Sequence, residues 1–238
     1  MSKLACAISA VLVLSGASIA VAQEGGASIT GTVKLDGAAK KAKKINSQLD
    51  GDKFCGPQRG GQDVFSEELI VGADNAVANV LVIVKGVQGK FEPPKEPAEI
   101  DQNKCIYKPH VVVVRLGQTL NIKSSDDTMH NIHGLPTLNK EFNESQSKPG
   151  SVAPRTFTVP EIGIKVKCDV HPWMGAWLHV LDHPFYSLTG TDGKFTIGKL
   201  PAGKYMVEVW HKKLKGKPIE VTVGDKEAKT QDFTLKAE

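Results

Sequence analysis

The chain has 238 residues, enough for one large or two small domains. Its 30 lysines and arginines slightly outnumber its 26 aspartates and glutamates, which gives a formal net charge of +4 at pH 7. This small positive excess favours acidic protein partners, and we expect no nucleic-acid partner. The sequence lacks a C-x-x-C-H haem motif, a cysteine-rich run for an iron–sulfur cluster and a glycine-rich phosphate loop. It also lacks a hydrolase elbow and paired catalytic carboxylates, so we expect that the protein is not an enzyme.

Residues 1–22 have the pattern of a secretory signal peptide. Lys3 precedes an apolar stretch that ends with Ala20-Val21-Ala22, an A-x-A cleavage motif. The apolar stretch is too short to span a bilayer securely. We therefore predict cleavage after Ala22 and a mature protein that is periplasmic or secreted, without stable membrane insertion.

The rest of the chain has the pattern of β structure. Alternating apolar and polar residues, or runs of β-branched residues, predict strands at 27–35, 79–85, 111–114, 119–123 and 163–167. Asp36-Gly37 is typical of a hairpin turn after the first of them. A proline-rich stretch at 92–97 excludes a strand there, and no helical periodicity of useful length follows residue 22. We predict an all-β fold.

Residues 168–174 place a thiol, an imidazole and a thioether in one short loop, with the spacing Cys-x2-His-x2-Met. Cys168 directly follows the last of these strands, and Pro172 stiffens the chain after His171 because its ring fixes φ. One thiolate, two imidazoles and one thioether are the ligands of a mononuclear blue-copper site. Zinc is the rival metal, but it favours further thiolates or harder ligands over a thioether. We expect Cys168, His171 and Met174 to bind copper.

The second imidazole must come from another part of the chain. The stretch 126–134 contains His130 and His133 and follows a predicted strand, so both histidines are expected on the loop beyond it. The residues alone do not choose between them. The adjacent carboxylates of Asp126 and Asp127 are interpreted as solvated.

The segment 105–181 resembles the cupredoxin family, and its Cys-x2-His-x2-Met loop is most similar to the amicyanin type. The resemblance implies a Greek-key β-sandwich with one type 1 copper ion. In this family the upstream ligand is a histidine followed by an asparagine, which matches His130 and Asn131; His133 in place of His130 is the alternative. The resemblance also implies that Asn131 ties the two loops together near the Cys168 sulfur. The resulting ligand set and its immediate surroundings are His130, Cys168, His171 and Met174, with Asn131, Asp169, Pro172 and Trp173 around them.

Three cysteines remain after removal of the signal peptide, Cys55, Cys105 and Cys168. In an oxidising compartment two of them are expected to pair. With Cys168 assigned to the metal, we predict a Cys55–Cys105 disulfide, which closes a loop of about 50 residues. A second metal site made of Cys55, Cys105 and His110 is the alternative.

Both ends of the mature chain resemble a second, smaller sandwich. The sequence TDGKFTIGKLPAGKY resembles the transthyretin-like sandwich of carboxypeptidase regulatory domains, and ITGTVKLDG resembles the first strand of such a domain. Whether these segments form one sandwich or two is left open. We divide the chain into four parts. They are a signal peptide (1–22), an N-terminal β segment that is transthyretin-like (23–90), a cupredoxin copper-binding domain (100–182) and a carboxypeptidase-regulatory-like domain (183–238).

These features predict a type 1 (blue) copper protein that carries single electrons between redox proteins. The sequence identifies neither the donor nor the acceptor. We expect the edge of His171 to be exposed for electron entry and exit, and Trp173 to shape the surface beside it. A copper-binding protein for storage or delivery, without electron transfer, is the alternative.

Overall fold

The computed structural model describes residues 25–39 and 41–237, so the predicted signal peptide at 1–22 lies outside the described residues. Within them the chain forms eighteen strands and only three helices, which have three to five residues each. The predicted all-β fold is confirmed. No helix in this part of the chain has the length and apolar character needed to cross a bilayer.

The two ends of the described chain together build one sandwich, which we call the terminal sandwich. Its strands are β1 (Ala27–Leu35), β2 (Leu81–Lys85), β12 (Tyr186–Leu188), β13 (Lys194–Leu200), β14 (Gly203–Trp210), β15 (Leu214–Lys215), β16 (Ile219–Val223), β17 (Ala228–Thr230) and β18 (Phe233–Ala237). One sheet has the order β13-β1-β18-β15, with β17 also paired to β1, and the other has the order β12-β2-β14-β16. The terminal segments thus form a single sandwich, a point that the sequence left open.

Strand β1 lies in the interior of its sheet, which makes the N-terminal segment part of the core. Its alternation places Ile29 and Val33 inward, where both are fully buried. The strand pairs antiparallel with β13 and parallel with β17 and β18. Gly31 lies where the partner changes from β17 to β18, and a Cβ there would overlap the carbonyl oxygen of Gln231.

The chain between β2 and β12 builds the central sandwich. Its strands are β3 (Ala98–Asn103), β4 (Ile106–Lys108), β5 (Val111–Arg115), β6 (Leu120–Ser124), β7 (His130–Leu135), β8 (Phe142–Gln146), β9 (Ser151–Arg155), β10 (Glu161–Lys167) and β11 (Gly175–Leu181). One sheet has the order β4-β3-β6-β9 and the other the order β5-β11-β10-β7-β8. Inward-facing side chains of both sheets, such as Ile122 and Leu178, are fully buried between them.

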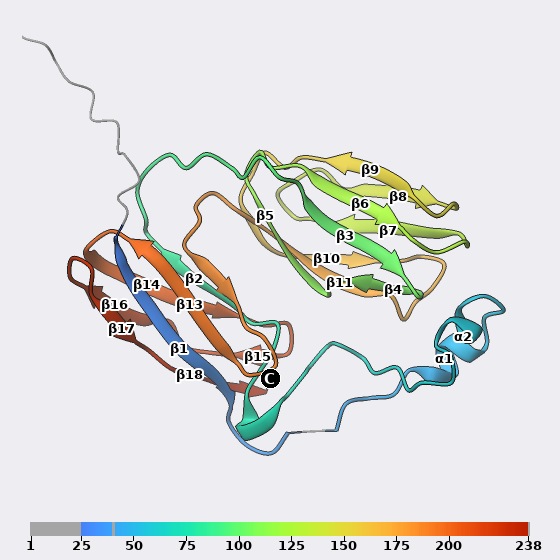
Figure 1. Cartoon of the computed structure of the whole chain (residues 1–238), viewed down its shortest axis with the longest axis horizontal. Coiled ribbons are helices and arrows are strands. Elements are labelled where there is room, and N and C mark those ends of the chain that lie inside the picture. Colours follow the sequence, from blue (N-terminus) through green and yellow to red (C-terminus); the bar gives the residue numbers. More distant parts are fainter. Residues whose placement is uncertain (1–24, 40, 238) are drawn as a thin grey trace, which may run out of the picture.

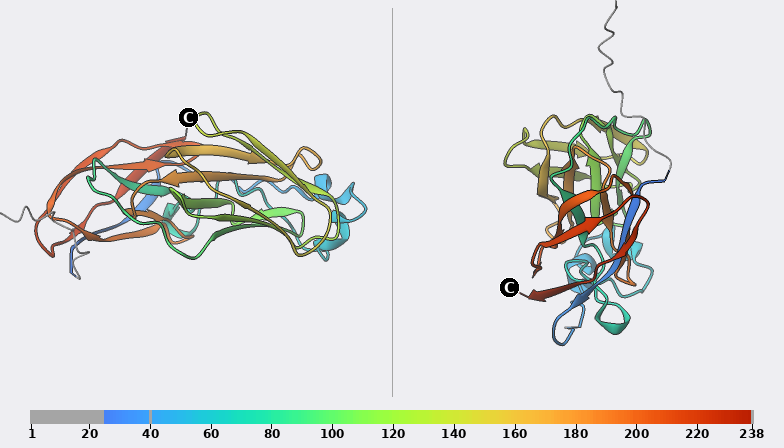
Figure 2. Two further views of the ribbon diagram at one scale, coloured as in Figure 1. Left: turned by 90° about the horizontal axis from the view of Figure 1, so that it is seen from above. Right: turned by 90° about the vertical axis from the view of Figure 1, so that its left-hand side faces the viewer.

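The two sandwiches follow one another along the molecule and share a small apolar contact (Figures 1 and 2). Two residues of β2 pack against Leu181 of β11 in a cluster of their own. Beside it, the ring of Trp210 in β14 lies 5.3 Å from that of Trp177 and 4.4 Å from that of His179, both in β11. The terminal sandwich therefore touches the outer face of the sheet that contains β10 and β11.

The connection between β1 and β2 leaves the terminal sandwich and reaches the far end of the central one (Figure 1). There it forms α1 (Asn46–Asp50) and α2 (Cys55–Gln58), and it returns through the short 3-10 helix η1 (Ala73–Asn75). The structure contains the predicted disulfide, since Cys55 of α2 is bonded to Cys105 in the turn between β3 and β4. We call residues 45–65 the covering segment because its Asp52 lies against His171.

We predict that Ile29→Ala lowers the free energy of unfolding by about 2 to 5 kcal/mol, because it leaves a cavity in the fully buried core of the terminal sandwich. Ile162→Ala removes the same atoms from a side chain that is 36% exposed, and should cost about 1 kcal/mol or less. Chemical denaturation of both variants checks this. Equal losses would mean that β1 is not an integral part of the core.

Candidate metal centre

The candidate ligands lie where two chain segments converge at one end of the central sandwich. Strands β7 and β10 are paired, with Lys167 opposite His133, so the start of β7 and the loop after β10 lie side by side. We call residues 168–174 the ligand loop. Its own backbone closes it: Met174 N donates to His171 O at 2.9 Å, and Cys168 N donates to Met174 O at 3.3 Å. A loop closed in this way holds its side chains in fixed directions.

Three of the four expected donor groups meet at one point. The Nδ1 atoms of His130 and His171 are 2.9 Å apart, and the Cys168 Sγ atom is 3.8 Å from the His171 Nδ1 atom. All three donor atoms lie within 4.8 Å of one another, and each side chain is at most 3% exposed. Met174 is 1% exposed and belongs to the same buried cluster as Cys168. The described structure thus brings together the residues that the sequence suggested.

The other nitrogen of each imidazole faces a carboxylate. His130 Nε2 lies 3.0 Å from Asp126 Oδ2, and His171 Nε2 lies 3.5 Å from Asp52 Oδ2. Metal-binding histidines commonly use their second nitrogen in this way, because the contact fixes the ring and its tautomer. The interpretation of Asp126 as solvated was wrong: it is 5% exposed and also accepts hydrogen bonds from the backbone N–H groups of Lys104 and Cys105. The sequence carries no signal for Asp52.

Asn131 joins the two segments. Its Oδ1 atom accepts the backbone N–H of Asp169 at 2.8 Å and lies 3.3 Å from Cys168 Sγ, which donates to it as a thiol. The Tyr107 hydroxyl donates to the backbone carbonyl of Asn131 at 2.5 Å. The Asn131 side chain therefore lies next to the Cys168 sulfur, as the resemblance implied.

Asp169 and His133 lie outside the converging donor atoms. The Asp169 carboxylate accepts from Asn131 Nδ2 at 2.9 Å and forms an ion pair with Lys167. His133 contacts Asp169 through Nδ1 and Glu141 through Nε2, at 2.9 and 2.7 Å. Residues three apart in a strand point to opposite faces, so His133 faces away from His130. Its two nitrogens are engaged with carboxylates at the surface.

Trp173 and Pro172 form the outer side of the ligand loop. The Trp173 ring lies 4.9 Å from that of His171, and its Nε1–H donates to the backbone carbonyl of Cys105 at 3.0 Å. Pro172 is exposed. Trp173 therefore packs beside the His171 ring and ties the loop to the turn that carries the disulfide.

The covering segment closes the centre on the side of the histidines. Asp52 accepts the backbone N–H groups of Phe54 and Cys55, which orients its carboxylate at the start of α2 towards His171. His171 is only 3% exposed, so the predicted exposed edge of this histidine was wrong. A short helix held by the disulfide lies where solvent was expected. Sequence periodicity could not reveal this, because the segment is too short and irregular.

Two further groups of potential ligands overlap the centre, and each includes one sulfur of the disulfide. They are Asp52, Cys55 and His171, and Cys105, Asp126 and His130. A disulfide sulfur is no thiolate, and the thiolate is the form that binds metals. The alternative site of Cys55, Cys105 and His110 is contradicted for the same reason. In the described residues, Cys168 is the free cysteine.

The surroundings shift the pKa values of the three donor groups in different directions. Burial opposes a charge on His130, but hydrogen bonds to Asp126 and Cys168 outweigh it and raise the pKa of His130 to about 9. Burial likewise opposes ionisation of Cys168, yet the hydrogen bond with His130 and nearby backbone N–H groups lower the pKa of its thiol. Burial and the neighbouring His130 lower the pKa of His171. The site therefore makes the Cys168 thiol easier to ionise and keeps His171 neutral more readily, next to a His130 that holds its proton more tightly.

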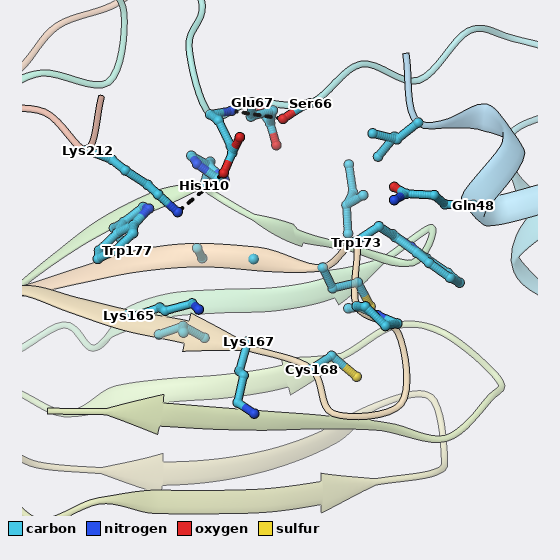
Figure 3. A pocket seen from close by; sticks show the side chains of 18 of the residues that line it. Gln48, Ser66, Glu67, His110, Lys165, Lys167, Cys168, Trp173, Trp177 and Lys212 are labelled. Carbon is cyan, nitrogen blue, oxygen red and sulfur yellow. Dashed lines mark hydrogen bonds and ion pairs between the residues drawn. The ribbon is translucent and has the colours of Figure 1, made fainter. Parts of the chain in front are cut away.

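A cleft of about 470 Å³ opens beside the ligand loop (Figure 3). Its walls include Cys168, Trp173 and Met174 from the loop, together with residues of β10, β11 and the covering segment. The candidate ligands His130 and His171 do not line this cleft. The centre is thus approached from the sulfur side.

No family model and no curated protein matches this sequence. Solved structures similar to part of the chain include the Cu-containing nitrite reductase (NirK) from Thermus scotoductus SA-01, with 19% identity over 42% of this chain and 26% of that one, and a TM-score of 0.35. A second is a purple cupredoxin from Nitrosopumilus maritimus, with 22% identity over 35% of this chain and 98% of that one, and a TM-score of 0.30. A third is a Cu(I) structure of an amicyanin mutant, with 19% identity over 42% of this chain and 97% of that one, and a TM-score of 0.32.

We predict that His130 keeps its proton at neutral pH in the metal-free protein and loses it near pH 9. A metal ion needs the neutral ring, so this proton alone should make apparent metal affinity rise about tenfold per pH unit up to that pH. NMR titration of the ring and metal titrations at several pH values check both statements.

Asp126→Asn should lower the pKa of His130, whereas the matched change in the exposed neighbour, Asp127→Asn, should leave it unchanged. A His130 pKa that is ordinary and insensitive to Asp126 would contradict the assignment of this ion pair.

Proposed function

We propose that this protein binds one copper ion in a type 1 site made by His130, Cys168, His171 and Met174, and that it carries single electrons. The observation that supports this most is the convergence of two Nδ1 atoms and one Sγ atom within 4.8 Å, in a buried place. The second nitrogens of both imidazoles are already directed to carboxylates. This is the arrangement that a resident metal requires of its histidines.

The donor chemistry favours copper over zinc. A single thiolate, two imidazoles and a thioether suit an ion that alternates between Cu(I) and Cu(II), whereas structural zinc sites use more thiolates or harder ligands. Copper would supply the one-electron chemistry. The chain would supply a fixed frame: the ligand loop is closed by its backbone, and Asn131 joins it to β7. A frame that moves little keeps the cost of changing oxidation state small.

Several finer features belong to the same proposal. The resemblance of the segment 105–181 to cupredoxins favours redox proteins as partners and a periplasmic or secreted location. The absence of a second imidazole cluster and of catalytic motifs in the sequence favours a carrier over an enzyme. The net charge of +4 favours acidic partners.

Copper storage or delivery is the second candidate function, and the covering segment favours it. With Asp52 and the disulfide against the histidines, His171 is 3% exposed, which suits retention of an ion better than rapid exchange of electrons at that edge. The colour of the Cu(II) complex separates the two functions, because strong visible absorption requires the short thiolate bond of a type 1 site.

We predict that addition of Cu(II) to the metal-free protein gives intense visible absorption that Cys168→Ser abolishes. His130→Gln should also abolish it, whereas His133→Gln should preserve it because His133 faces the surface carboxylates. Absorption and paramagnetic resonance spectra check this. A colourless complex in the unmodified protein would refute the electron-carrier proposal.

We predict that Met174→Leu retains copper but raises the reduction potential, because loss of a weak donor destabilises Cu(II) more than Cu(I). A tenfold loss in relative affinity for Cu(II) would correspond to about 60 mV for a one-electron couple. Voltammetry measures the shift. A potential that does not change would exclude Met174 as a ligand.

A further inference from the structure

The cleft beside the ligand loop has a floor that the strand register determines. Lys165 in β10 lies opposite Trp177 in β11, and Lys167 lies opposite Gly175, all on the outer face of the sheet. Gly175 offers no side chain, so the floor is hollow between the lysines and the tryptophan. Figure 3 shows the two lysines and Trp177 along this face.

The walls come from parts of the chain that are distant in sequence. Lys43, Gln48 and Phe65 belong to the connection between β1 and β2, and Lys212 comes from the terminal sandwich. Trp173 of the ligand loop lies beside Gln48, at the other end of the cleft from Lys212 and Trp177 (Figure 3). The cavity of about 470 Å³ lies within the size range of small-molecule sites, about 300 to 1,000 Å³.

The cleft is lined by more lysines than carboxylates. Lys167 is paired with Asp169, and Glu68 is paired with Lys212. Glu67 also lines the cleft, and burial raises the pKa of its carboxyl. Among the described residues, Lys43 and Lys165 form no ion pair, and the four lysines of the lining outnumber its three carboxylates, so the cleft has a small positive excess.

The apolar lining of the cleft includes three aromatic side chains, Phe65, Trp173 and Trp177. Phe65 is 43% exposed, which is unusual for so large an apolar side chain, and Trp173 and Trp177 are partly exposed. Aromatic faces next to ammonium groups favour a flat ring that carries a negative group, since the ring can stack while the anion contacts the lysines.

We propose that this cleft is a binding site for a small aromatic anion, such as an aromatic carboxylate or a phenolate. The ring lies between Trp173, Trp177 and Phe65, and the negative group contacts Lys43 and Lys165. Cys168 and Met174 also line the cleft, but the contacts proposed for the anion come from side chains outside the metal donor set, so the proposal goes beyond the copper function and does not depend on it. Its occupant lies against Trp173, whose ring is 4.9 Å from that of His171.

The test uses 2-naphthoate as the probe and the metal-free protein. The chain has three tryptophans, so their indole N–H signals in a two-dimensional NMR spectrum report on the cleft individually. We expect saturable shifts of the Trp173 and Trp177 signals with a Kd of about 1 mM or tighter. The neutral analogue 2-naphthylmethanol and the non-aromatic anion cyclohexanecarboxylate should each bind several-fold more weakly.

The double variant Lys43→Gln/Lys165→Gln should weaken binding of 2-naphthoate about tenfold, because two charge contacts are lost. The control variant Lys194→Gln/Lys199→Gln removes two exposed lysines from β13 of the terminal sandwich and should leave the affinity unchanged. Equal binding of the neutral analogue, an unchanged affinity in the first variant, or no saturable shift at about 10 mM probe would overturn the proposal. Because no metal is present, these outcomes do not depend on the copper proposal.

Discussion

The candidate centre depends on one asparagine side chain. Asn131 is the second residue of β7, and its amide oxygen accepts the backbone N–H of Asp169 in the ligand loop. The same oxygen lies beside the sulfur of Cys168, and the backbone carbonyl of Asn131 accepts the hydroxyl of Tyr107 in β4. Three segments from both sheets of the central sandwich are therefore joined at one residue. A rigid frame around the sulfur follows from this connection and from the closed backbone of the loop.

The centre has two sides of different character. On the side of the histidines, the covering segment places Asp52 and the disulfide against the rings, and His171 is buried. On the side of the sulfurs, a charged and aromatic cleft reaches the ligand loop. The terminal sandwich contributes to this second side, since its Trp210 packs against Trp177 and its Lys212 lines the cleft. The terminal sandwich therefore shapes the approach to the centre.

The sequence predicted what local patterns encode. Alternation and runs of β-branched residues predicted β1, β2, β5, β6 and β10. The short spacing from Cys168 to Met174 brought three candidate ligands into one loop without knowledge of the fold. Cysteine counting led to the disulfide that the structure contains. Asp52 and the buried role of Asp126 could not be found, because both depend on contacts between segments that no local pattern encodes. The parallel pairing of β1 with β17 and β18 is likewise a long-range choice. The transthyretin-like character of the terminal sandwich stays a prediction.

The position of the disulfide has a consequence for how the protein matures. Cys55 and Cys105 hold the covering segment over the same two histidines that face Cys168. An ion that arrives before these cysteines are joined meets open histidines, whereas an ion that arrives later must enter past the wall of the cleft. Under the proposed copper function, disulfide formation and metal insertion are therefore not independent steps of assembly. If the chain is exported as proposed, the rate of disulfide formation sets the time during which the easier route is open.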